Sequence, residues 1–316
     1  MQYKHNGCII YIFIDISEGF NYPYYLYIPQ NAFNKKERSY MIVEGNNSDV
    51  SDTYEAHEEY IKMLIGAGNG PRYYADSLSA PLLIPAFPRL YDFMNEPYMQ
   101  FLDRKALLTD NEQMKRVDLQ LTAMIKHAQK LLNKYGITVE DKVFLTGYSS
   151  SAKFAQRYAT LQPHMVKAMA VGGIAGTTIL PLESYKGVKL RYPVGIADFE
   201  ELTGSKFNAK EYKKIAQYLY MGEYDTNDAT QYIDCYDEED AQTIWKLFGT
   251  DQIKDNRLQN TIKAMEKGGF TDSVQYHIYK NTGHEITDNS NNDVVEFFKA
   301  NSGDVFKKIT PHEAGR

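Results

Sequence analysis

The sequence predicts an α/β protein with a mostly parallel central sheet flanked by helices, built as a single domain over residues 1–316. Short apolar segments alternate with longer segments of helical periodicity, and strands that alternate with helices usually pair in parallel. One apolar strand runs directly into a serine-rich turn and a helix, between residues 143 and 161. The 316 residues, of which 43% are hydrophobic, are enough for one large core.

The individual elements follow from apolar runs and from the residues that interrupt them. Two opening strands are expected to be antiparallel, and Gly136 is a suitable end for the longest helix. Strands are expected at residues 9–14, 24–28, 41–44, 82–85, from 143, and at 168–171, 215–221 and 274–279. Helices are expected at residues 54–65, 111–135, 153–161, 234–247, 256–267 and 292–300.

Residues 172–214 interrupt this alternation. They separate two predicted strands by far more than an ordinary connection needs, and long loops in compact domains are usually lids, binding loops or disordered segments. The aromatic side chains of this stretch argue against disorder. We therefore interpret residues 172–214 as an inserted lid or cap over a site.

The turn after the strand at residue 143 carries the strongest functional signal. A serine in a tight strand-to-helix turn is strained, and the residues two before and two after it must be small. Gly147 and Ser151 meet that demand around Ser149, although glycine is usual at the position of Ser151. The alternative is a serine-rich helix cap, since serine is a favoured capping residue.

The partners of such a serine should follow it in the order acid, then histidine. Asp225 lies in the loop after the strand at 215–221, with Asp228 as the alternative acid, although either could simply cap a turn. His284 follows a glycine after the last strand. His277 lies inside that strand and His312 lies in a polar tail, so His284 is the best candidate for the base.

These segments resemble those of serine esterases with the α/β-hydrolase fold. The segments are Gly147-Tyr148-Ser149, Gly222-Glu223-Tyr224-Asp225 and Gly283-His284, and the resemblance extends over about residues 9–298. It is greatest to bacterial carboxylesterases of the polyhydroxybutyrate-depolymerase and feruloyl-esterase kind. In such an enzyme Ser149 attacks a carbonyl, His284 accepts its proton and Asp225 orients the imidazole.

The resemblance also implies an oxyanion hole. In this fold one donor is the backbone N–H of the residue after the nucleophile, here Ser150. The second comes from the loop after an early strand, and we expect it at Asn46, with Asn47 as an alternative. The family often has His-Gly at the start of this loop, where this chain has Glu44-Gly45. An ordinary Asn-rich loop is the competing interpretation.

Several further residues are candidates for substrate contact. We expect contacts from Asn47, Phe87, Tyr148 and Asp228. Arg89 could bind a substrate carboxylate, but a salt bridge is the more common role for such a residue. The aromatic residues near Phe87 could line an apolar pocket, although core packing explains them at least as often; they are Tyr91, Phe93 and Tyr98.

Composition narrows the possible partners. The net charge of −6 and the pI near 5.7 argue against binding to nucleic acids or to anionic membranes. No segment approaches the length of a membrane span, and the apolar run near the N-terminus is more typical of a strand than of a signal peptide. A cytoplasmic location is expected unless a signal segment has been removed.

The cysteines and the short motifs suggest no cross-link and no bound group. Cys8 and Cys235 indicate no disulfide framework, and no motif implies a metal or another cofactor.

The leading functional hypothesis is an esterase that cleaves a small-molecule or acyl-ester substrate through an acyl-enzyme. A peptidase or thioesterase could use the same three residues, since one fold supports many chemistries. A non-catalytic binding protein on a hydrolase scaffold is the third hypothesis, because Ser151 and Glu44 depart from the usual pattern. Acyl and alcohol specificity and oligomeric state stay open.

Overall fold

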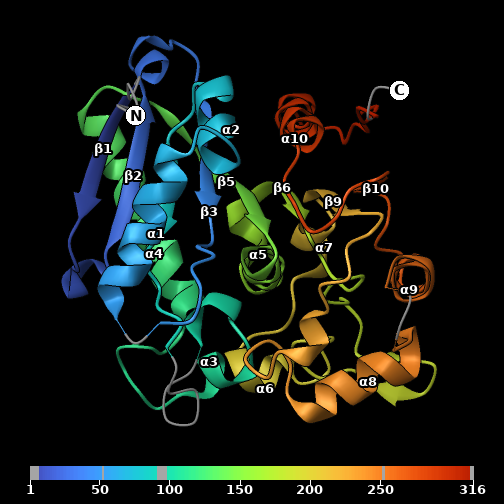
Figure 1. Cartoon of the computed structure of the whole chain (residues 1–316). Helices are drawn as coiled ribbons and strands as arrows, with labels where there is room; N and C mark the ends of the chain where they lie inside the picture. The colour runs from blue at the N-terminus through green and yellow to red at the C-terminus, as the bar shows by residue number, and fades with distance from the viewer. Residues whose placement is uncertain (1–6, 52, 91–97, 251–252, 314–316) are drawn as a thin grey trace.

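The central feature of the molecule is one eight-stranded sheet. The computed structural model describes residues 7–51, 53–90, 98–250 and 253–313. The strand order is β1-β2-β4-β3-β5-β6-β9-β10 (Figure 1). The pairs β1–β2 and β2–β4 are antiparallel, and every pair from β4 to β10 is parallel, which confirms the predicted sheet. The strands are β1 Gly7–Ile12, β2 Tyr24–Pro29, β3 Ser39–Glu44, β4 Leu82–Pro85, β5 Val139–Tyr148, β6 Val166–Gly172, β9 Ala216–Gly222 and β10 Val274–Tyr279.

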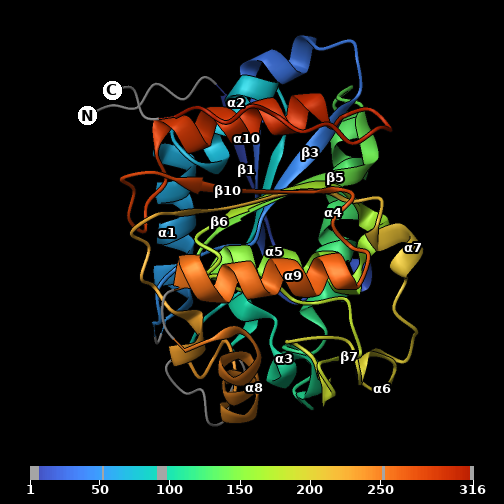
Figure 2. The same ribbon diagram turned by 90° about the vertical axis from the view of Figure 1, so that its right-hand side faces the viewer.

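Helices cover both faces of this sheet, as Figure 2 shows. Strands β2, β4 and β9 consist entirely of buried residues, as expected for strands packed on both sides. One face carries α1 Tyr54–Gly66, α2 Pro71–Leu78 and α10 Asp288–Ala300, and the other carries α4 Val117–Lys134, α5 Ser150–Leu161 and α9 Gln259–Lys267. None of the helices in the described ranges is long and apolar enough to cross a bilayer.

Several predicted elements differ from the observed ones at their ends: the helices predicted at 234–247, 256–267 and 292–300 are observed at Glu238–Phe248, Gln259–Lys267 and Asp288–Ala300, and the strand predicted from 143 begins at Val139. The first strand and the longest helix also end or begin differently. Strand β1 stops at Ile12 because its antiparallel partner β2 begins at Tyr24, which pairs with Ile12. Helix α4 begins only at Val117. Upstream, the Asn111 side chain accepts from the backbone N–H of Gln113. Such a local side-chain bond offers the backbone an alternative to the helix.

A second layer of packing covers α5 on the side away from the sheet (Figure 2). Its apolar cluster combines Phe101, Leu180, Cys235 and Met265, so it includes residues inside and outside the stretch 172–214. The elements of this layer are short: η3 Met99–Phe101, α3 Arg104–Leu108, β7 Ser184–Tyr185, β8 Val188–Lys189, α6 Phe199–Thr203, η5 Ala229–Gln231, α8 Glu238–Phe248 and the π-helical η6 Ile253–Leu258. Helix α7 Ala209–Tyr212 lies outside this layer, and its Tyr212 packs in the main core. We call this layer the cap; a lid role for residues 172–214 stays a prediction. Three further 3-10 turns lie outside the cap: η1 Ile16–Glu18, η2 Gln30–Asn34 and η4 Pro163–Met165.

Arg157 anchors the cap to α5. All twelve residues of α5 are buried, because the sheet covers one side of the helix and the cap covers the other. The Arg157 guanidinium donates to the carbonyl of Phe101 at 2.8 Å and to that of Cys235 at 2.7 Å, and it lies over the ring of Tyr236. One buried cation thus satisfies carbonyls of two separate cap segments.

Replacing Arg157 should therefore loosen the cap. We expect Arg157→Met to lower the free energy of unfolding by about 3 kcal/mol, since two buried carbonyls lose charged donors. Chemical denaturation measures the difference. The exposed pair of Lys130 and Glu18 supplies a control: Lys130→Met should change stability by less than about 0.5 kcal/mol. Equal effects of both substitutions would contradict the anchoring role.

Candidate active site

Ser149 occupies a strained turn between β5 and α5. Its φ of 61° and ψ of −116° lie in a region that residues with side chains rarely adopt. A Cβ on Gly147 would lie only 2.5 Å from the carbonyl carbon of Ser151, so glycine is required there. The backbone N–H of Ser149 donates to the Gly172 carbonyl on β6 at 3.0 Å. The turn therefore places Ser149 at the carboxyl end of β5, and its role as a nucleophile stays a prediction.

Asp225 and His284 form a hydrogen-bonded pair beside this turn. His284 Nδ1 lies 2.9 Å from both carboxylate oxygens of Asp225, whose side chain is fully buried. The imidazole packs against the Tyr148 ring with centroids 5.0 Å apart. A Cβ on Gly173 would come within 2.9 Å of His284 Cε1, so that glycine leaves room for the imidazole. With Nδ1–H bonded to Asp225, Nε2 is left as an acceptor.

Asn227 stands between the serine and the histidine, and sequence reasoning missed it. Its Nδ2 lies 3.4 Å from Ser149 Oγ and 3.1 Å from His284 Nε2. Within the described part of the chain, no direct hydrogen bond joins Ser149 Oγ to His284 Nε2. The one feature of the sequence that could have pointed to Asn227 is its position two residues after the candidate acid Asp225. The three predicted residues thus share one site, with a carboxamide between two of them.

Ser150 and Asn46 carry the two backbone N–H groups that the sequence analysis expects to bind an oxyanion. Ser150 is the first residue of α5, so its N–H has no partner within the helix and lies at the positive end of the helix dipole. Asn46 has a φ of 59° in the loop after β3. Its side chain donates to the Phe87 carbonyl and accepts from the Ser48 N–H, which fixes the loop.

Asn47 ties this loop to the turn. Its Nδ2 donates to the Tyr148 carbonyl at 2.8 Å, and its Oδ1 accepts from the Ser150 hydroxyl. The carboxamide therefore holds both neighbours of Ser149 at once. In this structure Asn47 has a positioning role, in addition to lining the cleft as expected for a substrate contact.

Glu44 and Ser151, the two departures from the usual pattern, are neighbours in space. Burial raises the pKa of Glu44 to about 8, although a hydrogen bond with the Ser151 side chain opposes the shift. The Ser151 hydroxyl also accepts from the Tyr148 N–H at 2.8 Å. A protonated Glu44 carboxyl beside a serine hydroxyl satisfies the polar groups of both residues. The two unusual residues thus complement each other under the turn.

A cavity of about 270 Å³ opens at Ser149. Its polar lining includes Asn47, Asp49, Arg89, Lys153, Asn227 and Tyr232. Lys153 is fully buried, and burial lowers the pKa of its ammonium to about 7. Its Nζ donates to the carbonyls of Ile174 and Thr177, both at 2.7 Å, and so holds the loop after β6 against α5.

The remaining candidate contacts are Phe87, Arg89 and the aromatic residues near them, of which Arg89 lines the cavity. Phe87 is fully buried in the core beside Tyr22 and Phe154. Arg89 Nε pairs with Asp234 Oδ2 at 2.6 Å, which agrees with the salt-bridge interpretation. Tyr98 is a buried residue near Arg89, whereas Tyr91 and Phe93 lie outside the described residues.

Asp228 forms a buried ion pair with Arg257. The guanidinium donates to Oδ1 at 2.5 Å and to Oδ2 at 2.9 Å. Burial opposes ionisation, yet hydrogen bonds from Arg257 and Thr230 lower the pKa of Asp228 below its ordinary value. Both carboxylate oxygens are engaged by the chain itself. Asp228 is therefore placed to hold the loop after β9 in position.

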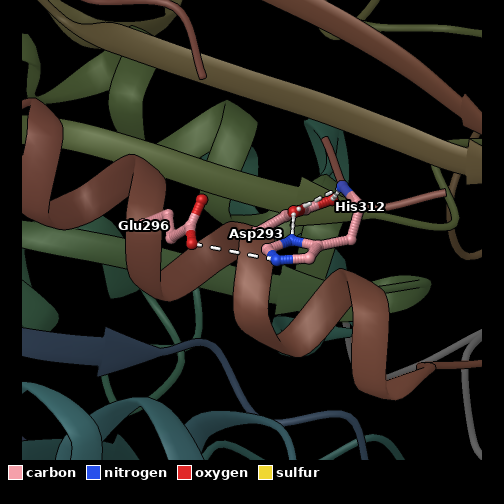
Figure 3. A group of neighbouring side chains, drawn as sticks. All are labelled: Asp293, Glu296 and His312. Atoms are coloured by element: carbon pink, nitrogen blue, oxygen red, sulfur yellow. Dashed lines mark hydrogen bonds and ion pairs between the residues drawn. The ribbon is translucent and has the colours of Figure 1, made fainter. Parts of the chain in front are cut away.

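A second cluster of titratable side chains lies on α10, with His312 from the C-terminal segment (Figure 3). Among the described residues, Asp293, Glu296 and His312 form the one group of three side chains close enough to share a metal ion. Asp293 instead accepts from the His312 N–H at 3.0 Å, from His312 Nδ1 at 2.6 Å and from the Tyr279 hydroxyl. Internal hydrogen bonds thus account for the cluster, which clamps the C-terminal segment onto α10.

Comparison with known proteins identifies the fold. The chain matches no protein-family model and no curated protein sequence. LpqC, a poly(3-hydroxybutyrate) depolymerase from Bordetella parapertussis, matches over 93% of this chain and 87% of its own, with a TM-score of 0.56 and 16% identity. Poly(aspartic acid) hydrolase-1 from Sphingomonas sp. KT-1 matches over 89% and 94%, with a TM-score of 0.52 and 14% identity. The chain has the α/β-hydrolase fold, as the sequence predicts.

The buried carboxyl of Glu44 predicts a pH-dependent stability. A folded-state pKa raised to about 8 contributes stability that is complete below the ordinary value near 4.5 and is lost as the pH rises through 8. Glu44→Gln lacks this titration, so its melting temperature relative to wild type should increase from pH 5 to pH 9. Thermal unfolding at pH 5, 7 and 9 checks this, with the exposed Glu112→Gln as control. A difference that is constant with pH would exclude the predicted burial of the acid.

The Asp228–Arg257 pair predicts a loss of stability when one partner is removed. Asp228→Asn should lower the free energy of unfolding by about 3–5 kcal/mol, since Arg257 is left charged and buried. The double variant Asp228→Asn/Arg257→Met should regain much of that loss. Urea denaturation of the three proteins measures both effects. If Asp228→Asn instead raises KM at unchanged stability, Asp228 contacts substrate as the sequence analysis expected.

Proposed function

We propose that this protein is a serine hydrolase that cleaves carboxylic esters through an acyl-enzyme intermediate. The observation that carries the proposal is the placement of Ser149 on the strained turn beside His284, which is hydrogen-bonded to the buried Asp225. The α/β-hydrolase fold supports it, because the fold brings these three segments to one end of the sheet.

In the proposed acylation step, Ser149 Oγ attacks the ester carbonyl carbon and transfers its proton to His284 Nε2. The carbonyl π electrons move to oxygen, where the N–H groups of Ser150 and Asn46 would stabilise the negative charge. Such preorganised donors contribute about 3 kcal/mol each to the transition state. Asp225 holds the imidazole tautomer and stabilises the imidazolium. The carbonyl then reforms, the bond from carbon to the alcohol oxygen breaks, and the alcohol leaves with the proton from His284.

In the proposed deacylation step, a water molecule transfers a proton to His284 Nε2 and its oxygen attacks the acyl carbon. The C–Oγ bond breaks, Oγ recovers the proton from the imidazolium, and the acid product leaves. The cavity of about 270 Å³ with its polar lining supports a small polar ester over a long-chain lipid ester. Val50, Phe101, Ala175 and Ala229 are the apolar side chains of the lining that would contact a short acyl group.

Covalent labelling with a fluorophosphonate probe tests the nucleophile. The wild type should be labelled at Ser149, and Ser149→Ala should not be labelled. Both Ser149→Ala and His284→Ala should lower kcat for p-nitrophenyl acetate by at least about a thousandfold. Activity should fall along a series from acetyl to longer p-nitrophenyl esters.

Three outcomes would change the assignment. An unlabelled wild type with no ester turnover would favour the binding-protein hypothesis. Labelling at Ser149 with turnover of matched amides as fast as esters would indicate a peptidase. Faster turnover of acetyl thioesters than of oxygen esters would indicate a thioesterase.

A further inference from the structure

The carboxamide of Asn227 occupies the space that a reacting ester must share with the serine and the histidine. Its Nδ2 lies 3.4 Å from Ser149 Oγ and 3.1 Å from His284 Nε2. Asn227 follows the acid in the loop after β9, and its backbone N–H donates to Asp225 Oδ1 at 3.0 Å. The same carboxylate therefore positions both the imidazole and the residue that faces it.

The hydrogen bonds define which end of the carboxamide faces the reacting atoms. His284 Nδ1–H bonds to Asp225, so Nε2 is an acceptor and requires a donor. The NH₂ group of Asn227 supplies that donor. On the other side, the Tyr232 hydroxyl donates to Asn227 Oδ1 at 3.1 Å. The hydrogen bonds to Tyr232 and His284 thus decide which end of the Asn227 carboxamide is oxygen and which is nitrogen. They direct its N–H bonds toward the site.

This location corresponds to the leaving-group side of the site. His284 Nε2 delivers the proton to the departing alcohol oxygen, so that oxygen must approach Nε2 during the reaction. A donor close to both Nε2 and Ser149 Oγ faces the same oxygen. We propose that Asn227 is a further catalytic residue, whose N–H stabilises the departing alcohol oxygen of the ester. The inference rests on the proposed serine-hydrolase function.

The step to which Asn227 contributes is the collapse of the tetrahedral intermediate. The oxyanion electron pair reforms the carbonyl, the bond between carbon and the alcohol oxygen breaks, and its electron pair stays on that oxygen. The proton on His284 Nε2 transfers to the oxygen, which leaves as a neutral alcohol. Asn227 donates a hydrogen bond to the oxygen while its negative charge develops, and it loses no proton itself.

This role makes the contribution of Asn227 depend on the alcohol. A p-nitrophenolate leaves readily and needs little stabilisation, whereas an alkoxide from an unactivated alcohol is strongly basic and needs much. Asn227 therefore matters most for esters of ordinary alkyl alcohols. A residue that only supports the fold affects both kinds of ester alike.

The experiment compares p-nitrophenyl acetate with ethyl acetate. Both esters give the same acetyl-enzyme, and kcat/KM reports steps up to acylation, so their ratio isolates the leaving group. In Asn227→Ala, kcat/KM for ethyl acetate should fall at least tenfold further than for p-nitrophenyl acetate. The isosteric Asn227→Asp, which cannot donate an N–H, should show the same selective loss and covers the case in which the alanine variant does not fold.

Two tyrosines provide a matched comparison. Tyr232→Phe removes the hydroxyl that orients Asn227, and it should shift the ratio of the two esters in the same direction by a smaller factor. The exposed Tyr224 makes the equivalent bond to Asn281 Oδ1 at 3.3 Å, away from Asn227. Tyr224→Phe should leave the ratio unchanged.

The outcomes separate this inference from the proposed function. Wild-type labelling and turnover with an equal loss for both esters in the Asn227 variants would overturn the leaving-group role. A rise for both esters would also overturn it, because Asn227 would then only obstruct the site. If the wild type shows neither labelling nor turnover, the proposed function itself fails.

Discussion

The left-handed backbone of Ser149 is the constraint on which the surrounding structure depends. This conformation requires a residue without a side chain at Gly147 and a compact one at Ser151, since the strand and the helix nearly touch there. It also leaves the N–H of Ser150 without a helical partner, and Asn47 then holds both neighbours of the serine. Strain of this kind persists only where the surrounding structure over-determines it. The hydrogen bonds of the site therefore stabilise the strained turn, in addition to any contact that they make with a ligand.

Much of the fold and the core of the site could be predicted, because their signals are local. Apolar runs mark the strands, and Ser149, Asp225 and His284 each follow a strand in the expected order. The contacts that could not be predicted depend on partners distant in sequence. Nothing near Asp228 indicates Arg257, and nothing in the aromatic pattern around Phe87 indicates that its ring faces the core. Asn227 is near the acid in sequence, but its bond to His284 exists only once two strands are paired.

The cap and the site are joined through the polar side chains of one buried helix. A helix covered on all sides is usually apolar, yet α5 buries Lys153, Gln156, Arg157 and Thr160. The two cations among them bind backbone carbonyls: Lys153 binds those of the loop after β6, and Arg157 binds those of two cap segments. Charged hydrogen bonds to carbonyls replace apolar packing at these points. The helix that begins at the serine thus fixes the loops that form the walls of the cleft.

The contact of Glu44 with Ser151 also has an evolutionary consequence. Restoring glycine at position 151 alone would leave the buried carboxyl of Glu44 without its hydroxyl partner. If Glu44 alone is replaced, the Ser151 hydroxyl keeps its bonds to the N–H and the carbonyl of Tyr148. The route toward the usual pattern that begins at Ser151 therefore passes through an unsatisfied buried group, and the route that begins at Glu44 does not. The two positions are therefore epistatic: the cost of glycine at position 151 depends on whether a carboxyl is still buried at position 44, so the order of the two changes matters.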